Sequence, residues 1–305
     1  MELDKFIRDN FACPVCKYGG LKFLPNALLC DNCHHLYNIK IYDGKEIINF
    51  IPDFKSPFTN PVQKLWEYLL EQSSVIEEKL LRGLMDFDNA GKQYCRFNFS
   101  NLKILDVGGG SGEMRRYLNG REKVYVCLDP DPRAYKNRKI LGNLDSKLNN
   151  DFNFVLGVAE YLPFKSETFD FLIMNGMIEH VFNINFAFSE AYRVLKKGGK
   201  FFIGADFHGA NIKNIKISPV IKVKTFFLNQ GFSATFKRIM GRIVFNLRRR
   251  LSPWKEIFDF TQPQVENGHI YDDLKIDDIK KLGGEFGFKT SYEIENQTSL
   301  IFTKH

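Results

Sequence analysis

Residues 104–114 read ILDVGGGSGEM, an apolar run that ends in an aspartate and is followed by four glycines within five positions. A short apolar run of this kind is typical of a buried strand. A Gly-rich turn lets a ligand approach the backbone closely, at the N-terminus of the helix that follows. We therefore expect a strand, a tight turn and a helix, with a ligand held against the turn.

The spacing of the glycines indicates which ligand is suitable. Dinucleotide sites use Gly-x-Gly-x-x-Gly and place the pyrophosphate at the helix N-terminus. Here Gly108, Gly110 and Gly112 follow Asp106 at alternate positions, and Glu113 stands where the third dinucleotide glycine would be. A carboxylate repels a pyrophosphate but attracts a positively charged ligand. The turn therefore favours a cationic ligand without phosphate.

From Lys103 onward, short apolar runs alternate with helical stretches. This alternation predicts a mostly parallel sheet with helices on both faces. Two further strands close to the end must pair antiparallel, because a parallel pair needs a long crossover. The predicted strands are 103–107, 124–128, 153–158, 169–174, 200–205, 289–295 and 298–304, and the predicted helices include 111–118, 184–195, with Lys-Lys-Gly-Gly as its C-cap, and 276–288.

Four stretches together carry a family resemblance. LDVGGGSGEM resembles motif I of the class I S-adenosylmethionine-dependent methyltransferases, and VYVCLDPD places Asp129 where that family uses an acid to bind the ribose hydroxyls. AEYLPFKSETFDFLIMNGMIEHV and AYRVLKKGGKFFIG resemble the segments that follow, so the resemblance covers residues 102–206. It implies a Rossmann-like α/β fold with a seven-stranded, mostly parallel sheet and a C-terminal antiparallel strand, with S-adenosylmethionine as cofactor.

The chain departs from the family pattern after the third strand. Family members often have an aspartate there that holds the adenine amino group, whereas this chain reads Gly-Val-Ala-Glu at 157–160. The adenine would then be bound by main-chain groups at Val158 and Ala159, or by Glu160. Asp106 either touches the ligand or positions the turn through backbone amides. The expected cofactor-binding residues are Asp106, Gly108, Gly110, Gly112, Asp129, Val158, Ala159, Glu160 and Asn175.

Catalytic candidates are polar residues at the carboxyl ends of the strands, where ligands of open α/β sheets bind. Methyl transfer depends mainly on holding acceptor and donor in line, and a general base is needed only when the acceptor must lose a proton. The two candidate bases are His208 and His180, with a solvent-facing or loop-stabilising role as the alternative. Further polar residues at these strand ends are Asn175, Glu179, Asp206 and His269.

Four of the six cysteines lie within 21 residues, in the pattern Cys-x2-Cys-x13-Cys-x2-Cys. Two such turns present four thiolates to one ion and leave no open position, which predicts a structural zinc site in a reducing compartment. Redox or iron chemistry is the alternative, and His34 or His35 could replace the last cysteine. The expected ligands are Cys13, Cys16, Cys30 and Cys33.

With LYNIKIYDGKEIINFIP behind it, this unit resembles the small zinc-binding activator subunit of tRNA and protein methyltransferases. We expect a zinc-binding domain over 1–55, a helical linker over 56–100 and a methyltransferase domain over 101–305.

A basic insertion interrupts the last domain at about 207–267. Residues 207–256 contain eleven Lys and Arg against one Glu, a net charge of +10, while the whole chain carries +7. Three roles stay open: a cap over the acceptor pocket, a surface for an anionic membrane or lipid-linked acceptor, and an RNA-binding surface. The charge of this segment predicts an anionic partner there, which would be a lipid-linked acceptor, a membrane surface or RNA.

The leading hypothesis is methyl transfer to a small-molecule or lipid- or sugar-linked acceptor. The alternatives are an RNA methyltransferase and a non-catalytic, methyltransferase-like regulator, which the missing acid at Val158 would favour. No signal peptide or membrane span is expected, so the predicted location is cytoplasmic, with peripheral membrane association as an option.

Overall fold

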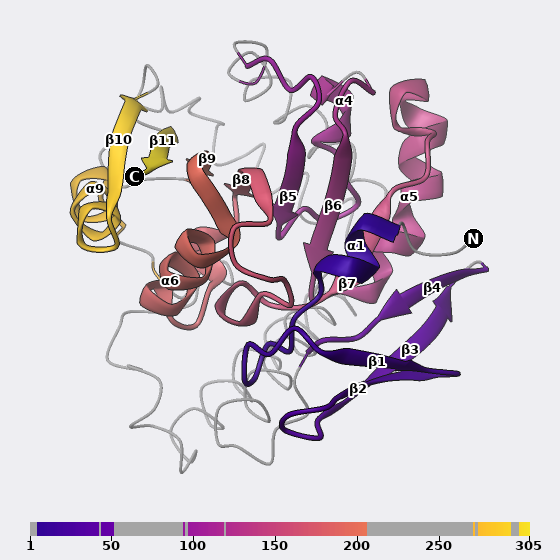
Figure 1. Cartoon of the computed structure of the whole chain (residues 1–305). Coiled ribbons are helices and arrows are strands. Elements are labelled where there is room, and N and C mark those ends of the chain that lie inside the picture. The colour runs from indigo at the N-terminus through magenta and orange to yellow at the C-terminus, as the bar shows by residue number, and fades with distance from the viewer. Residues whose placement is uncertain are drawn as a thin grey trace, which may run out of the picture.

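The computed structural model describes residues 5–42, 44–51, 94, 97–118, 120–205, 271, 274–293 and 299–305 (Figure 1). Most of the predicted linker 56–100 and the whole basic insertion 207–267 lie outside the described residues.

A seven-stranded sheet forms the body of the molecule, in the order β10-β11-β9-β8-β5-β6-β7. The five strands from β7 to β9 are parallel to one another, whereas β11 runs antiparallel to both of its neighbours. The predicted fold class is therefore confirmed. The strands are β5 (Lys103–Val107), β6 (Val124–Asp129), β7 (Asn153–Leu156), β8 (Phe169–Asn175), β9 (Leu195–Gly204), β10 (Phe288–Glu293) and β11 (Ser299–Lys304).

Helices cover the sheet on both faces, because each crossover between parallel strands must pass over one of them. Apolar side chains of successive strand residues consequently enter two core clusters, one on each side of the sheet. The helices are α4 (Arg115–Leu118), α5 (Pro132–Leu144), α6 (Ile184–Val194) and α9 (Ile276–Glu285), with short 3-10 turns η1 (Ser146–Leu148), η2 (Ala159–Tyr161) and η3 (Ile178–His180).

Three helix boundaries differ from the predicted ones; one of them is the end of α9, which lies at Glu285 and not at residue 288. The helix predicted over 111–118 begins only at Arg115, because Gly112 adopts φ +81°, which an α-helix does not accommodate. The predicted Lys-Lys-Gly-Gly C-cap is wrong: α6 ends at Val194 and the next residue already belongs to β9. Gly198, with φ +77°, lies inside the span of that strand.

The N-terminal residues form a separate four-stranded antiparallel sheet in the order β1-β2-β3-β4, preceded by α1 (Lys5–Asn10). Two Cys-x2-Cys turns flank its first two strands. The strands are β1 (Leu21–Leu24), β2 (Ala27–Cys30), β3 (Leu36–Tyr42) and β4 (Lys45–Ile48).

This small sheet is joined to the large one by backbone pairing. Asn49, just after β4, forms a parallel bridge with Leu156 at the end of β7, and the Phe50 amide donates to the Leu156 carbonyl at 2.8 Å. Phe11 forms an antiparallel bridge with Phe164, with the Phe11 ring 4.9 Å from the Phe50 ring and 5.6 Å from the Phe164 ring. Figure 1 shows the small sheet beside the β7 edge. The two sheets therefore share one hydrophobic core.

Candidate functional site

The glycine turn lies at the carboxyl end of β5, and its backbone has the conformation that only glycine adopts without strain. Gly108 and Gly110 have φ values of +69° and +54°. A Cβ on Gly108 would lie 2.7 Å from the Cβ of Met177, so the chain after β8 packs directly on the turn. The carboxyl ends of β5 and β8 are thereby brought into contact around the turn.

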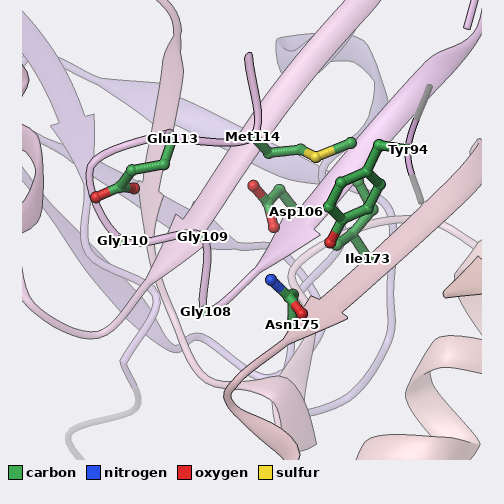
Figure 2. Close-up of a pocket in the computed structure, with 9 residues that line it drawn as sticks. All are labelled: Tyr94, Asp106, Gly108, Gly109, Gly110, Glu113, Met114, Ile173 and Asn175. Carbon is green, nitrogen blue, oxygen red and sulfur yellow. The ribbon is translucent and has the colours of Figure 1, made fainter. Parts of the chain in front are cut away.

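A pocket of about 170 Å³ opens beside this turn. Figure 2 shows the Asp106 carboxylate between the turn, the Tyr94 ring and the Asn175 carboxamide. Among the described residues that line the pocket there are two carboxylates and no basic side chain, so its walls suit a cationic ligand. The lining residues are Tyr94, Asp106, Gly108, Gly109, Gly110, Glu113, Met114, Ile173 and Asn175.

A second tyrosine, Tyr125, holds the Asp106 carboxylate in place. The Tyr125 hydroxyl donates to Asp106 Oδ2 at 2.6 Å, and the carboxylate is only 3% exposed. Burial raises the pKa of Asp106 to about 7, and the charges of Glu113 and Asp129 act in the same direction, against the Tyr125 hydrogen bond. A positive charge placed in the pocket would therefore stabilise the ionised form of Asp106.

Asp129 ends β6, as predicted, and its carboxylate is tied to the backbone. Oδ2 accepts from the Gly110 amide at 3.0 Å, and Oδ1 accepts from the Asp131 amide at 2.8 Å. Burial raises the pKa of Asp129 to about 7, although these two hydrogen bonds lower it. Asp129 thus fixes the glycine turn against the neighbouring strand, and it does not line the pocket itself.

Glu113 is the third acid at the turn. Its pKa is raised to about 7 by burial and by the charge of Asp129, while Arg115 lowers it less. The Arg115 guanidinium is directed elsewhere, to the carbonyls of Leu148, Asn150 and Gly112. Three carboxyl groups with raised pKa values therefore surround one glycine turn.

The predicted adenine-side residues lie on η2. Val158 precedes this turn and, like Ala159, is almost fully buried, at 7% and 3% exposure. The Glu160 carboxylate accepts from the amides of Phe182 and Asn183 at 2.6 and 3.3 Å. Glu160 consequently holds the loop after η3 in place, and none of the three predicted adenine-side residues lines the pocket at the glycine turn.

The structure brings together only part of the predicted set. Asp106, Gly108, Gly110 and Asn175 line one pocket. Gly112 instead faces the protein interior, because a Cβ there would meet Arg115 Nε at 2.9 Å and the Phe152 ring at 3.0 Å.

Of the two candidate bases, only one can be placed. His180 closes η3, and its amide donates to the Met177 carbonyl at 2.9 Å. His208 lies outside the described residues, as do Asp206 and His269. Glu179 is 7% exposed, and its carbonyl accepts from the Tyr271 amide at 3.2 Å.

Sequence reasoning missed Tyr94, which lies before β5 in the predicted helical linker 56–100 and lines the pocket. It also missed Gly109, where a Cβ would lie 2.6 Å from Asp106 Cγ and 2.8 Å from Cys127 Sγ. The run of three glycines was the available signal for Gly109.

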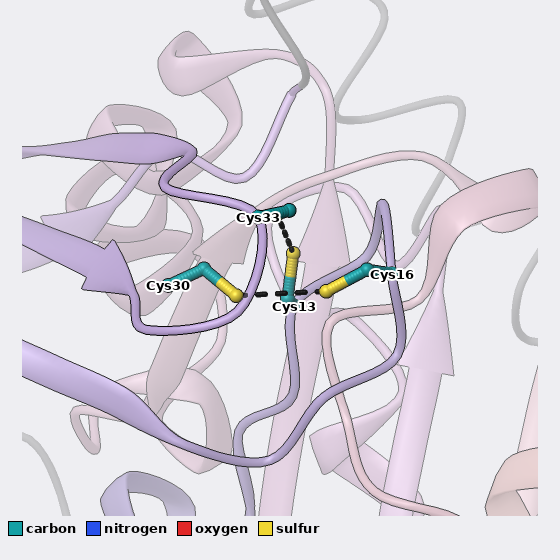
Figure 3. Close-up of side chains that lie close together, drawn as sticks. All are labelled: Cys13, Cys16, Cys30 and Cys33. Carbon is teal, nitrogen blue, oxygen red and sulfur yellow. Dashed lines mark hydrogen bonds between the residues drawn. The ribbon is translucent and has the colours of Figure 1, made fainter.

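The four clustered cysteines converge in the N-terminal unit, as Figure 3 shows. Their Sγ atoms all lie within 4.8 Å of one another, and the pairs Cys13–Cys33 and Cys16–Cys30 are 3.5 Å apart. Zinc bound tetrahedrally to four sulfurs would separate them by about 3.8 Å. The cluster therefore fits a four-thiolate zinc site, with no ligand position left for a substrate.

Comparisons with known proteins bear on the larger sheet. Residues 105–203 match the model of a family described as a methyltransferase domain. These residues form a methyltransferase-type domain. The matched segment runs from the strand before the glycine turn to the end of β9, and it excludes the cysteine unit and the segment 207–267.

The ubiquinone/menaquinone biosynthesis C-methyltransferase UbiE of Rickettsia prowazekii is 35% identical over 106 residues, which cover 33% of this chain and 43% of that protein. UbiE of Rhizobium johnstonii is 36% identical over 109 residues, covering 33% and 40%. The chain thus spans less than half the length of these curated relatives.

Among solved structures, a complex of the Haloferax volcanii Trm112 methyltransferase activator with a methyltransferase has a TM-score of 0.48 at 12% identity, covering 78% of this chain and 98% of that one. A Thermotoga maritima S-adenosylmethionine-dependent methyltransferase has a TM-score of 0.45 at 18% identity, covering 79% and 100%. We therefore assign the fold of the methyltransferase-type domain from its own strand order and not from these solved structures.

None of the helices in the described part of the chain combines the length and the apolar character that a membrane crossing requires.

Proposed function

We propose that this chain is an S-adenosylmethionine-dependent methyltransferase that acts on a small-molecule or lipid- or sugar-linked acceptor. One observation carries the choice of donor: the pocket at the glycine turn is lined by two carboxylates, and no basic side chain of the described residues joins them. A nicotinamide dinucleotide would bring a pyrophosphate to this turn, where Asp106, Glu113 and Asp129 would repel it. A donor with a sulfonium and an ammonium group would be attracted.

The bound donor would supply an electrophilic methyl group on its sulfonium. The glycine turn would let the donor approach the backbone, and Asp129 would accept from the ribose hydroxyls with the lone pairs that Gly110 and Asp131 leave unused. The backbone at 158–159 would face the adenine. Most of the rate would come from holding acceptor and methyl group in line.

The proposal of a small acceptor rests on the curated relatives, which are C-methyltransferases of quinone biosynthesis. Their similarity to this chain covers 106 and 109 residues, a third of the chain. We expect the acceptor to bind at the same edge of the sheet, near the carboxyl ends of β8 and β9, where Asn175 and His180 lie.

We further propose that the cysteine cluster holds a structural zinc ion. The ion would fix two turns of a unit whose strands are too short to bury a core alone. The shared core with the methyltransferase-type domain would then depend on the metal.

Calorimetric titration with S-adenosylmethionine tests the donor directly. Wild-type protein should bind it, and Asp129→Ala should weaken binding at least about tenfold, since a buried acceptor of ligand hydroxyls is lost. Asp277→Ala, at a carboxylate that is 86% exposed on α9, is the matched control and should bind normally. Binding of NADH in place of S-adenosylmethionine, or full binding by Asp129→Ala, would contradict the proposal.

The acceptor is best identified by incubating the protein with cofactor that carries a labelled methyl group and with cell extract. Label in the small-molecule or lipid fraction is the expected result. Label in RNA would instead support the alternative of an RNA methyltransferase.

A further inference from the structure

The four cysteines of the cluster differ in their access to solvent. Cys13 and Cys30 are completely buried, whereas Cys16 is partly exposed and Cys33 is exposed. A structural metal site does not require this difference, because four buried sulfurs can bind a tetrahedral ion equally well. Access matters for another chemistry, since oxidants attack cysteines that are thiolates and can be reached from solvent.

The sulfurs are also paired across the two cysteine turns. Figure 3 marks the pairs Cys13–Cys33 and Cys16–Cys30, whose Sγ atoms are 3.5 Å apart. Each pair joins one cysteine of the first turn to one of the second, and each contains one accessible and one buried cysteine. A disulfide bond is about 2.05 Å long, so the sulfurs of each pair would approach by about 1.5 Å to form one. Each accessible sulfur therefore has a buried partner close to bonding distance.

The two buried cysteines are held in position by hydrogen bonds. The Cys13 amide donates to the Tyr18 carbonyl, and the Cys30 amide donates to the His35 carbonyl, both at 2.9 Å. The Tyr37 hydroxyl, on a residue that is 1% exposed, lies 2.9 Å from Cys13 Sγ. The buried sulfurs are thus placed to attack a neighbouring sulfur that has been oxidised.

We propose that the cysteine cluster is a redox site, at which a hydroperoxide oxidises the four thiolates to the disulfides Cys13–Cys33 and Cys16–Cys30 and the zinc ion is released. The inference rests on the proposed structural zinc, and it does not depend on methyl transfer.

The reaction at each pair consumes one peroxide. The accessible thiolate attacks a peroxide oxygen, so that an S–O bond forms, the O–O bond breaks and hydroxide leaves. The buried thiolate then attacks the sulfenic sulfur, so that the S–S bond forms and the S–O bond breaks with loss of a second hydroxide. The pair gives two electrons to the peroxide, and the two hydroxides take up two protons from solvent to become water. Two such reactions remove all four ligands of the ion.

Oxidation of this kind would preserve the connection between the two turns. Two disulfides across the turns replace the metal as the link, so the oxidised unit should stay folded. Disulfides are reduced again by thiol–disulfide exchange, so a dithiol together with zinc should restore the metal site.

The first test uses the full chain loaded with zinc, in a variant with Cys95→Ser and Cys127→Ser, so that only the cluster supplies thiols. Hydrogen peroxide should release about one zinc ion per chain to a metallochromic indicator, while the four thiols and about two peroxides are consumed. Dithiothreitol with added zinc should return the four thiols and the bound ion.

Mass spectrometry of wild-type protein tests the pairing and the order of attack. Digested oxidised protein should contain Cys13–Cys33 and Cys16–Cys30. A short pulse of hydrogen peroxide with dimedone, which traps sulfenic acids, should label the two accessible cysteines and not the two buried ones. The oxidised chain should also unfold at a urea concentration closer to that of wild type than Cys16→Ser does, because the serine variant has neither the metal nor both disulfides.

Three results would overturn the inference: disulfides within a single Cys-x2-Cys turn, dimedone on the buried cysteines, or zinc that stays bound at a peroxide concentration that oxidises free glutathione. Metal analysis of the untreated protein distinguishes these results from failure of the zinc proposal. A chain purified under reducing conditions that binds no zinc would overturn that proposal, and this inference with it.

Discussion

The cysteine cluster and the glycine turn are both built from short loops at strand ends, but their polar groups differ in one respect. The four Sγ atoms of the cluster lie within 4.8 Å of one another, and as thiolates they would fill the coordination shell of the proposed zinc ion. At the glycine turn, three carboxyl groups have raised pKa values, and two of them line a pocket together with Tyr94, whose hydroxyl has no partner among the described residues. The first site would be complete with the proposed zinc ion alone, whereas the second would need a ligand that brings its own charge.

The two sites should therefore contribute to the stability of the fold in opposite ways. A closed metal site adds its binding free energy to folding. A pocket that gathers like charges costs folding free energy, and recovers it when a cation binds. Changes at the cysteines should therefore act first on the fold, and changes at the turn should act first on ligand binding.

The largest expected effect comes from removing one thiolate. Cys16→Ser alters a partly exposed ligand by one atom, so loss of core packing contributes little. We expect bound zinc to fall from one ion per chain to none, and the free energy of unfolding to drop by roughly 5 kcal/mol or more. Metal analysis and urea unfolding measure the two changes.

Cys127→Ser, at a buried cysteine of β6 outside the cluster, is the control and should keep its zinc. Since the small sheet shares a core with the large one, the Cys16 variant should lose both sheets in a single unfolding transition. A variant that lost its zinc and kept wild-type stability would show that the metal does not support the fold.

A smaller effect is expected at Glu190, which connects the first cysteine turn to the segment around Leu162 in the large domain. Its carboxylate is 6% exposed, and Oε2 accepts from Lys17, in the first cysteine turn, at 2.7 Å and from the Leu162 amide at 2.9 Å. Arg193 adds two further hydrogen bonds at 2.8 Å. Glu190→Gln should cost about 3 kcal/mol, because it removes the buried carboxylate that pairs with Arg193 and Lys17, both of which are partly exposed.

Urea unfolding measures this cost, and Lys17→Met separates its parts. The Lys17 side chain is 35% exposed and Glu190 keeps Arg193, so this variant should lose only about 1 kcal/mol or less. If Glu190→Gln were no worse than Lys17→Met, the carboxylate would not be the tie between the cysteine turn and the segment around Leu162.

Much of this fold follows from the sequence, since apolar runs bounded by turn residues marked all five parallel strands and the final antiparallel pair. The start of α4 was placed too early because a helical pattern does not reveal a left-handed glycine at position 112. The Lys-Lys-Gly-Gly C-cap expected after Leu195 was wrong, because Leu195 and both glycines belong to β9.

The candidate site could be predicted where it depends on local backbone. Asp106, Gly108 and Gly110 are adjacent in the chain, and the strand alternation placed Asn175 at the same edge of the sheet. Tyr94 could not be predicted, because only packing against Tyr117 and Phe202 brings it to the pocket. Docking of the two sheets was missed for the same reason: it depends on bridges between distant residues, such as Phe11 and Phe164.

The smallest expected effect concerns pH, and it has opposite signs for folding and for binding. Burial raises the pKa values of Asp106, Glu113 and Asp129 to about 7, from ordinary values of 3.8, 4.5 and 3.8. The folded protein without ligand therefore binds more protons than the unfolded chain between about pH 4 and pH 7, and these groups make stability fall as pH rises through that window.

A cationic donor favours the ionised carboxylates, so its affinity should fall by up to about tenfold per pH unit below pH 7 for each group that must ionise. Calorimetry at about pH 5.5, 6.5 and 7.5, in buffers of different ionisation enthalpy, should show proton release on binding at the lower values and a plateau at the highest. Glu113→Gln should release fewer protons, and an affinity independent of pH would mean that these carboxylates do not hold the positive charge of the donor.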